Sequence, residues 1–181
     1  MCIKPRRFKD LYIPNITLNG DVLDFVTCHK YLGYNIDVSF TDNKDISRQI
    51  RSIYAQGNSI DRKFQDCSPE VKSQLFKSYC SSFYCTTVWS DFKPTALQKL
   101  NIAYKRIFRS MFFFLKTGSV TSKMLQNNCN PLVVILRKLI NGFRTRLINS
   151  DNSLVHAIVS SVFYLNSAVT RQWNQDLFSF S

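Results

Sequence analysis

The spacing of apolar residues changes near Thr41, and this change restricts the fold more than any other feature of the chain. From Thr41 to about residue 165, apolar residues recur every three or four positions, which is the period of an α-helix with one buried face. Before Thr41, short runs of strand-forming residues are separated by turn residues. The sequence therefore predicts an α+β fold that is mainly α, with a small N-terminal antiparallel β-hairpin region followed by a bundle of about five to six helices.

Two turns are expected in the N-terminal region. Residues 16–18 and 22–26 flank Asn19-Gly20, the pair that most strongly indicates a hairpin because both residues accept positive φ. A second sharp turn is expected at residues 28–30, and a further strand at residues 31–36. Three short strands cannot bury two faces by themselves. They need helices beside them, or sheet neighbours that lie outside this chain.

Two of the predicted helices have a basic side. The first begins near Thr41 or Asp42, either of which can act as an N-cap. The apolar face of this helix comprises Ile46, Ile50, Ile53, Tyr54, Gly57, Ile60 and Phe64, and its basic face comprises Lys44, Arg48, Arg51 and Arg62. The other helix begins at Pro94 and ends at Gly118. Its apolar side lies opposite Lys99, Lys105, Arg106, Arg109 and Lys116.

A third helix is predicted between these two. Ser68 is a suitable N-cap, Pro69 fits the first helical position, and Glu70 complements the positive end of the helix dipole. This helix is expected to run to about Thr86. Its apolar stripe comprises Val71, Leu75, Phe76, Tyr79 and Phe83.

The remainder of the chain predicts shorter helices. One is expected at residues 120–127, another begins at Asn130-Pro131, and the last covers residues 153–165. The resulting division is 1–40 as the β-hairpin region, 41–117 as the principal helical region, 118–168 as further helices of the same or an extended bundle, and 169–181 as a weakly ordered tail.

The distribution of charge indicates a polyanionic partner. The chain has 24 Lys and Arg residues against 12 Asp and Glu residues. Residues 92–150 contain many cations and no acidic residue. A field of one sign attracts nucleic acid through phosphate contacts and counterion release. An inert basic surface, an acidic protein partner and an anionic membrane surface are the alternatives.

The sequence lacks the patterns of a membrane span and of a catalytic centre. No stretch approaches the roughly 20 apolar residues that cross a bilayer. The six cysteines form no C-x-x-C pair, so we expect reduced thiols in an intracellular protein, nuclear or cytoplasmic, with no membrane partner. Cys28-His29 has no second ligand pair at zinc spacing. Neither an adjacent pair of aspartates nor a glycine-rich phosphate loop is present.

One segment and the helices after it follow a known order. Residues 25–36 read FVTCHKYLGYNI, which contains a K-Y-L-G-x-x-I pattern beginning at Lys30. Two helices and then Trp89 follow, and the basic helix comes next. Over about residues 1–115 this order resembles the section of non-LTR (LINE-type) retrotransposon reverse transcriptases in which the edge of the palm, including a last strand at residues 1–3, leads into the thumb.

The resemblance implies a function as well as a fold. The family are RNA-directed DNA polymerases that use Mg²⁺ held by aspartates of a Y/F-x-D-D turn, and this chain has no such turn. It would retain template–primer binding without catalysis, so that as an isolated chain it is expected to be no enzyme and to hold no metal or cofactor. Its partners would be an RNA/DNA duplex or other nucleic acid and an upstream polymerase core. The expected nucleic-acid-binding residues are Lys30, Tyr31, Gly33, Arg48, Arg51, Lys99, Lys105, Arg106 and Arg109. The alternative is a basic helical protein-interaction module without polymerase ancestry.

Overall fold

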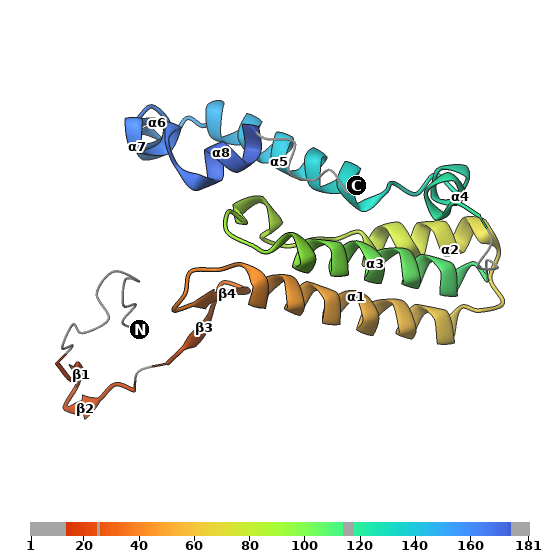
Figure 1. Ribbon diagram of the computed structural model, residues 1–181, viewed down its shortest axis with the longest axis horizontal. Coiled ribbons are helices and arrows are strands. Elements are labelled where there is room, and N and C mark those ends of the chain that lie inside the picture. Colours follow the sequence, from red (N-terminus) through yellow and green to blue (C-terminus); the bar gives the residue numbers. More distant parts are fainter. Residues whose placement is uncertain (1–13, 25, 114–117, 175–181) are drawn as a thin grey trace.

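The structure, a computed structural model, describes residues 14–24, 26–113 and 118–174 (Figure 1). Within these ranges the chain forms eight α-helices and two small antiparallel two-stranded sheets. The predicted fold class, mainly helical with N-terminal hairpins, is confirmed. The strand expected at residues 1–3 lies outside the described residues.

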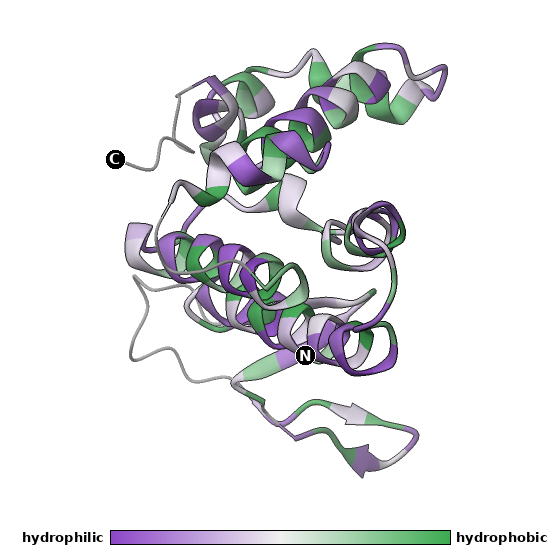
Figure 2. Ribbon diagram, turned by 90° about the vertical axis from the view of Figure 1, so that its right-hand side faces the viewer, coloured by the Kyte–Doolittle hydropathy of each residue, from purple (hydrophilic) through white to green (hydrophobic). Residues whose placement is uncertain are grey.

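The first hairpin has the predicted turn. Strands β1 (Thr17–Leu18) and β2 (Asp21–Val22) pair through Asn19 and Gly20, whose φ angles are 54° and 91°. Two successive positive φ angles define a type I′ turn, which suits the twist of the flanking strands. Every residue from 14 to 24 is exposed, and the hairpin projects away from the helices (Figure 2). Thus β1 and β2 bury no described side chain.

The second hairpin turns later than predicted. Strands β3 (Cys28–Tyr31) and β4 (Tyr34–Asp37) pair so that Tyr31 faces Tyr34. The turn therefore consists of Leu32 and Gly33, with φ angles of 45° and 82°. The expected turn at residues 28–30 is wrong, because His29 and Lys30 are strand residues and Gly33 supplies the positive φ that closes the hairpin.

Helices α1 (Asn43–Lys63) and α3 (Pro94–Met111) lie side by side and run in the same direction. At one end, the backbone N–H of Lys93 donates to the Asn43 side chain; at the other, Ser110 donates to Asp61. These two helices contribute about half of the core, and their core residues are Ile46, Ile53, Ile60, Leu97, Leu100, Tyr104, Ile107, Phe108 and Met111. Within the described residues, the predicted apolar faces of both helices are confirmed, apart from Phe64, which is 38% exposed. The predicted end of the second helix at Gly118 is wrong, because α3 ends at Met111 and Phe113 has a φ of 51°.

The helix between them differs from its prediction in length and in its buried face. Helix α2 (Pro69–Leu75) begins at the predicted cap, where the Ser68 hydroxyl accepts from the Val71 N–H, and continues as a π-helical turn, η1 (Phe76–Cys80). The helical run ends there, before the expected Thr86; a short 3₁₀ turn, η2 (Thr86–Val88), follows separately. The buried residues of this run are Lys72, Ser73, Phe76 and Cys80, whereas Val71 and Tyr79 are exposed. The π turn accounts for the burial of Cys80 in place of Tyr79, and a regular 3.6-residue pattern does not anticipate it.

The C-terminal part forms a second helical layer (Figure 1). Its helices are α4 (Val120–Gln126), α5 (Leu132–Ile148), α6 (Ser153–Val159), α7 (Val162–Leu165) and α8 (Ala168–Asn174). The single helix expected at residues 153–165 is divided, because the Ser161 hydroxyl caps a new helix by accepting from the Tyr164 N–H.

The expected weakly ordered tail is wrong for residues 169–174, since α8 continues through Asn174. The Trp173 indole N–H donates to the Thr87 carbonyl at 3.0 Å and its ring packs edge-on against Phe143. Residues 175–181 lie outside the described ranges. No described helix has both the length and the apolar character needed to span a bilayer.

Candidate nucleic-acid interface

A buried carboxylate at the start of α1 connects the β3–β4 hairpin to the loop before α3. Asp42 accepts a hydrogen bond from the Tyr34 hydroxyl of β4, and its other oxygen accepts from the backbone N–H groups of Ser90 and Asp91 at 2.7 and 2.8 Å. Burial raises the pKa of Asp42. Burial, together with the hydrogen bond to Asp42, also raises the pKa of Tyr34, so the Tyr34 hydroxyl stays protonated and donates.

A second carboxylate, one turn later, holds a charged partner. Asp45 is completely buried and accepts from the Trp89 indole N–H at 3.0 Å and from the Asn35 backbone N–H at 3.3 Å. Arg48 donates to both oxygens of Asp45, from Nε at 2.7 Å and from Nη2 at 3.2 Å. The side chain of Arg48 is only 22% exposed. Its charge is therefore compensated by Asp45. Asp42 and Asp45 together attach the β3–β4 hairpin to α1, and we call them the anchor; Arg48 stabilises this anchor and does not present a free cation.

The tip of the hairpin combines a close contact with exposed side chains. A Cβ added at Gly33 would lie 2.8 Å from Cε1 of Tyr84, so the glycine backbone rests on the tyrosine ring. Lys30 is exposed, and the Tyr31 side chain is 59% exposed. Gly33 thus has a packing role, while Lys30 and Tyr31 are accessible to a ligand.

The outer side of α3 is a cationic surface. Lys99, Arg106 and Arg109 are exposed, and Lys105 is half-buried. Among the described residues, no carboxylate forms an ion pair with any of these four side chains. Lys99 and Arg109 lie ten positions apart in the helix, which corresponds to about 15 Å along its axis. The outer side of α3 therefore presents a row of uncompensated charges.

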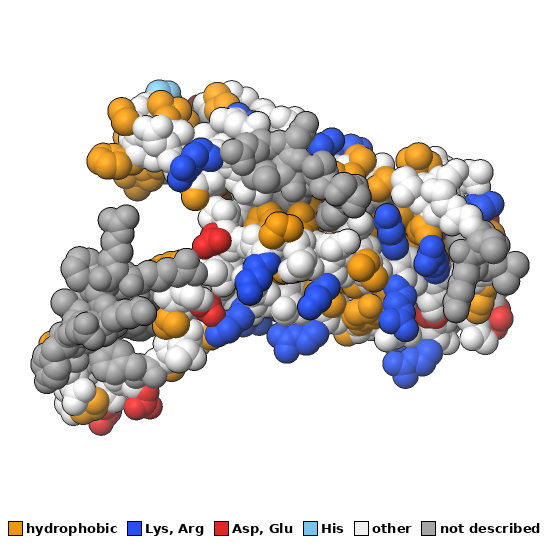
Figure 3. All heavy atoms as spheres, in the orientation of Figure 1, with side chains coloured by type: hydrophobic (Ala, Val, Ile, Leu, Met, Phe, Trp, Pro, Cys, Tyr) orange, Lys and Arg blue, Asp and Glu red, His pale blue; other side chains and the backbone are white. Residues whose placement is uncertain are grey.

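Helix α1 extends this surface. Arg51 is exposed, and the pairing of residue 43 with residue 93 and of residue 61 with residue 110 brings Arg51 level with the Lys99 end of α3. Figure 3 shows Lys and Arg side chains distributed over the face that α1 and α3 form. We call Arg51, Lys99, Lys105, Arg106 and Arg109 the α1–α3 basic face. Six of the nine expected binding residues therefore lie on the neighbouring helices α1 and α3, and all of these except Arg48 belong to this face.

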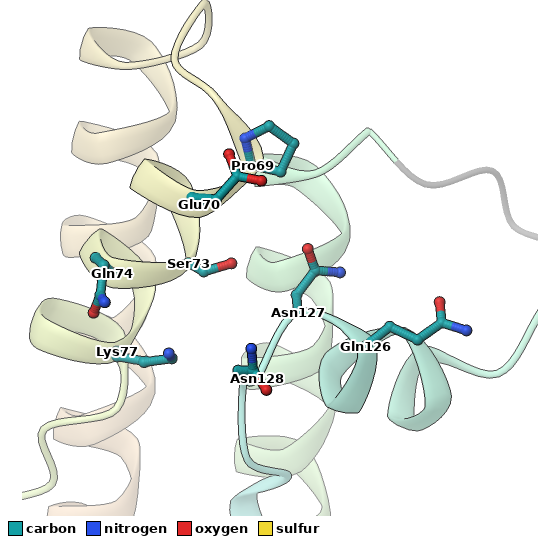
Figure 4. A pocket seen from close by; sticks show the side chains of 8 residues that line it. All are labelled: Pro69, Glu70, Ser73, Gln74, Lys77, Gln126, Asn127 and Asn128. Carbon is teal, nitrogen blue, oxygen red and sulfur yellow. The ribbon is translucent and has the colours of Figure 1, made fainter.

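Two cavities in the described part of the chain do not resemble a catalytic centre. One, of about 250 Å³, lies between α2 and the end of α4 (Figure 4). Its polar lining includes Ser73, Lys77, Asn127 and Asn128. The other, of about 510 Å³, is a more apolar groove beside the end of α1. Within the described ranges, no group of three His, Cys, Asp or Glu side chains is arranged to hold a metal ion.

Comparison with known proteins adds no relative. No protein-family model, no curated protein and no solved structure matches this chain.

The anchor formed by Asp42 and Asp45 is the part of the site that the sequence did not predict. In the sequence, Asp42 was a candidate helix cap, yet its side chain makes no capping bond to α1. Trp89 was the only indication of this anchor in the sequence, since a buried indole N–H requires an acceptor. Trp89 is 44 residues away from Asp45, so the sequence did not identify Asp45 as that acceptor.

Proposed function

We propose that this chain is the post-catalytic section of a LINE-type reverse transcriptase, comprising a palm-edge hairpin and a thumb-like helical layer, and that it binds an RNA/DNA duplex through phosphates. Catalysis would belong to a polymerase core outside these residues. Phosphate contacts of this kind fix the position of a duplex without reading its sequence.

The observation that carries the proposal is the α1–α3 basic face. Lys99, Arg106 and Arg109 are exposed on one helix without described ion-pair partners. Solvated faces of amphipathic helices commonly carry mixed charge, whereas the exposed side of α3 has cations and no acid. A partner that supplies regularly spaced negative charge, such as a nucleic-acid backbone, fits this face.

The exposed apolar side chains of the first hairpin support the other part of the proposal, which is that a polymerase core packs against this chain. Leu18 and Val22 are 61% and 58% exposed on a two-stranded hairpin that packs on no described helix. A hairpin of this size is marginal in water without further strands or a covering surface. Strands of a polymerase palm would cover both the apolar side chains and the open edge.

Binding can be measured by fluorescence anisotropy with a labelled RNA/DNA hybrid over a series of salt concentrations. Each phosphate neutralised by the protein contributes a slope of about −0.9 in log K against log salt. We expect charge reversal by Arg106→Glu and Arg109→Glu together to weaken binding about tenfold or more and to reduce this slope by about two.

A double variant on α5, Lys138→Glu with Arg146→Glu, is the matched control because it changes the net charge equally but leaves the α1–α3 basic face intact. It should reduce affinity much less. Absent or salt-insensitive binding by the wild-type chain would refute the proposal, and equal losses in the two double variants would show that only net charge matters. Retention of an acidic protein without nucleic acid would favour the interaction-module alternative.

A further inference from the structure

Helices α6 and α7 form an apolar surface that covers nothing in the described chain. Neither helix has a buried residue. We define the α6–α7 surface by its strongly exposed apolar side chains, which are Leu154 (68%), Ile158 (51%), Val162 (69%), Phe163 (91%) and Leu165 (58%). Figure 3 shows hydrophobic side chains gathered over these helices, at the end of the molecule where Figure 1 places α6 and α7. Contiguous exposed apolar surfaces of this kind mark interaction sites.

The charge around this surface is as distinctive as its hydrophobicity. Residues 152–170 contain no Lys, Arg, Asp or Glu, although the chain as a whole has a formal net charge of +12. Asp151 directly precedes this stretch and Arg171 directly follows it. The α6–α7 surface is therefore an uncharged area on a strongly cationic protein.

We propose that the α6–α7 surface binds the same surface of a second copy of this chain. Two copies that carry a large positive charge repel each other least where an uncharged area of one meets an uncharged area of the other, and this surface provides such an area. A two-fold contact places identical surfaces together, so the uncharged surface of one copy would meet the same uncharged surface of the other. An anionic membrane or an acidic partner would be matched by cations within the surface, and residues 152–170 contain no Lys or Arg.

The exposed area of the α6–α7 surface is consistent with a dimer interface. A stable interface buries about 800 Å² on each partner. A fully exposed phenylalanine alone contributes on the order of 200 Å², and Phe163 is 91% exposed. Together with four aliphatic side chains that are each more than half exposed, it supplies most of the area that one partner needs. Ile148, at the end of α5, is 62% exposed and enlarges the same end of the molecule.

The test is the oligomeric state of the full chain, measured by sedimentation velocity over two orders of magnitude in protein concentration. The wild-type chain should be a dimer that dissociates on dilution. Val162→Ser with Phe163→Ser should raise the dissociation constant about thirtyfold, as expected for loss of a central aromatic contact. Phe163→Lys, which would place like charges together across the two-fold axis, should also give monomers. Circular dichroism would verify that the variants keep their helices.

The matched control is Leu18→Ser with Val22→Ser, which removes a similar exposed apolar area from the first hairpin and should leave the dimer unchanged. A wild-type chain that is monomeric at every concentration would overturn the proposal, and so would an α6–α7 variant that dimerises normally. Co-sedimentation of a monomeric wild-type chain with vesicles containing phosphatidylserine, lost in the Phe163 variants, would assign the surface to lipid instead.

Discussion

Gly57 of α1 lies directly against Ile107 of α3. A Cβ atom added at Gly57 would be 2.3 Å from Cγ2 of Ile107 and 2.9 Å from its Cδ1. Both residues are buried, so the two helices approach each other at a point where only glycine fits. Because α3 carries most of the α1–α3 basic face, this contact also sets where Arg106 and Arg109 lie relative to Arg51.

Replacement of Gly57 by alanine should therefore destabilise the protein by about 1–3 kcal/mol, the usual cost of overpacking a core. Urea unfolding would measure the change. Gly142→Ala in α5 is the control, because a Cβ there would meet nothing closer than 4.0 Å. Alanine has a better helix propensity than glycine, so the control should gain about 0.5–1 kcal/mol. If Gly57→Ala is also stabilising, the close approach of α1 and α3 is wrong.

Arg48 and Arg51 should respond differently to the same substitution. Arg48→Gln leaves the buried carboxylate of Asp45 without its cation, and breaking a buried pair in this way costs about 3 kcal/mol or more. Arg51→Gln changes an exposed side chain, so its stability should stay within about 0.5 kcal/mol of wild type, while its affinity for the RNA/DNA hybrid should fall. Unfolding by urea and hybrid binding, measured on both variants, would separate the two roles. Similar profiles for both variants would contradict this assignment.

The turn of the second hairpin stores strain at Leu32. This residue has a φ of 45°, and its side chain is 73% exposed. The left-handed conformation costs leucine about 1–2 kcal/mol, whereas asparagine adopts it readily. Leu32→Asn would recreate the Asn-Gly turn of the first hairpin and should raise the free energy of unfolding by about 0.5–1 kcal/mol. Gly33→Ala should lower it, since both the positive φ and the Tyr84 ring oppose a Cβ. A neutral or destabilising Leu32→Asn would contradict the type I′ geometry.

The sequence correctly predicted turns and helix starts where a residue determines the conformation of its immediate neighbours. Asn19-Gly20 predicted its turn, and Ser68-Pro69 predicted the start of α2, because capping and positive φ depend on residues adjacent in sequence. The turn at Leu32 was missed for the same reason, since leucine is not a residue that favours positive φ. Its geometry is imposed by the pairing of β3 with β4.

Contacts between distant residues explain the remaining differences. Trp173 reaches Thr87, which lies 86 positions away, so composition alone suggested a weakly ordered tail where a helix forms. The ion pair of Arg48 with Asp45 is local, but Asp45 is buried because Trp89 and β4 cover it. The sequence pattern placed Arg48 on an exposed basic face of α1, because it does not show that Trp89 and β4 pack over Asp45. On α3 the same reasoning succeeded for Lys99, Arg106 and Arg109, because no element of the described chain packs on their side.

Acid should weaken the attachment of the second hairpin through Asp37. Burial acts to raise the pKa of Asp37, but the hydrogen bond and ion pair from Lys44 and two hydrogen bonds from Ser39 outweigh it and lower the pKa from 3.8 to about 2. The folded state therefore binds this proton less tightly than the unfolded state. The stabilising contribution is fully present above pH 3.8 and is lost as the pH falls toward 2.

Urea unfolding of the wild type and of Asp37→Asn across this range would test the contribution of Asp37. The difference between the two free energies should shrink as the pH falls, because the variant has no carboxylate to protonate. Burial raises the pKa of Asp42 and gives the opposite pH dependence, but this effect is common to both proteins and cancels in the difference. A difference that stays constant down to pH 2 would contradict the interaction of Asp37 with Lys44.

Hydrogen exchange should divide the N-terminal region into two parts. The first hairpin has exposed residues throughout and no described contact with a helix, so the amide N–H of Leu23, which donates to the Ile16 carbonyl, should exchange nearly as fast as in an unfolded chain. The second hairpin is attached to α1 through Tyr34 and Asn35, and its amides should be more protected. The facing sides of α1 and α3 should exchange most slowly, because their opening requires disruption of the core. Mass spectrometry of exchanged peptides resolves these three classes. Equal protection of both hairpins would show that β1 and β2 are covered within this chain, which would remove the argument that a polymerase core packs on them.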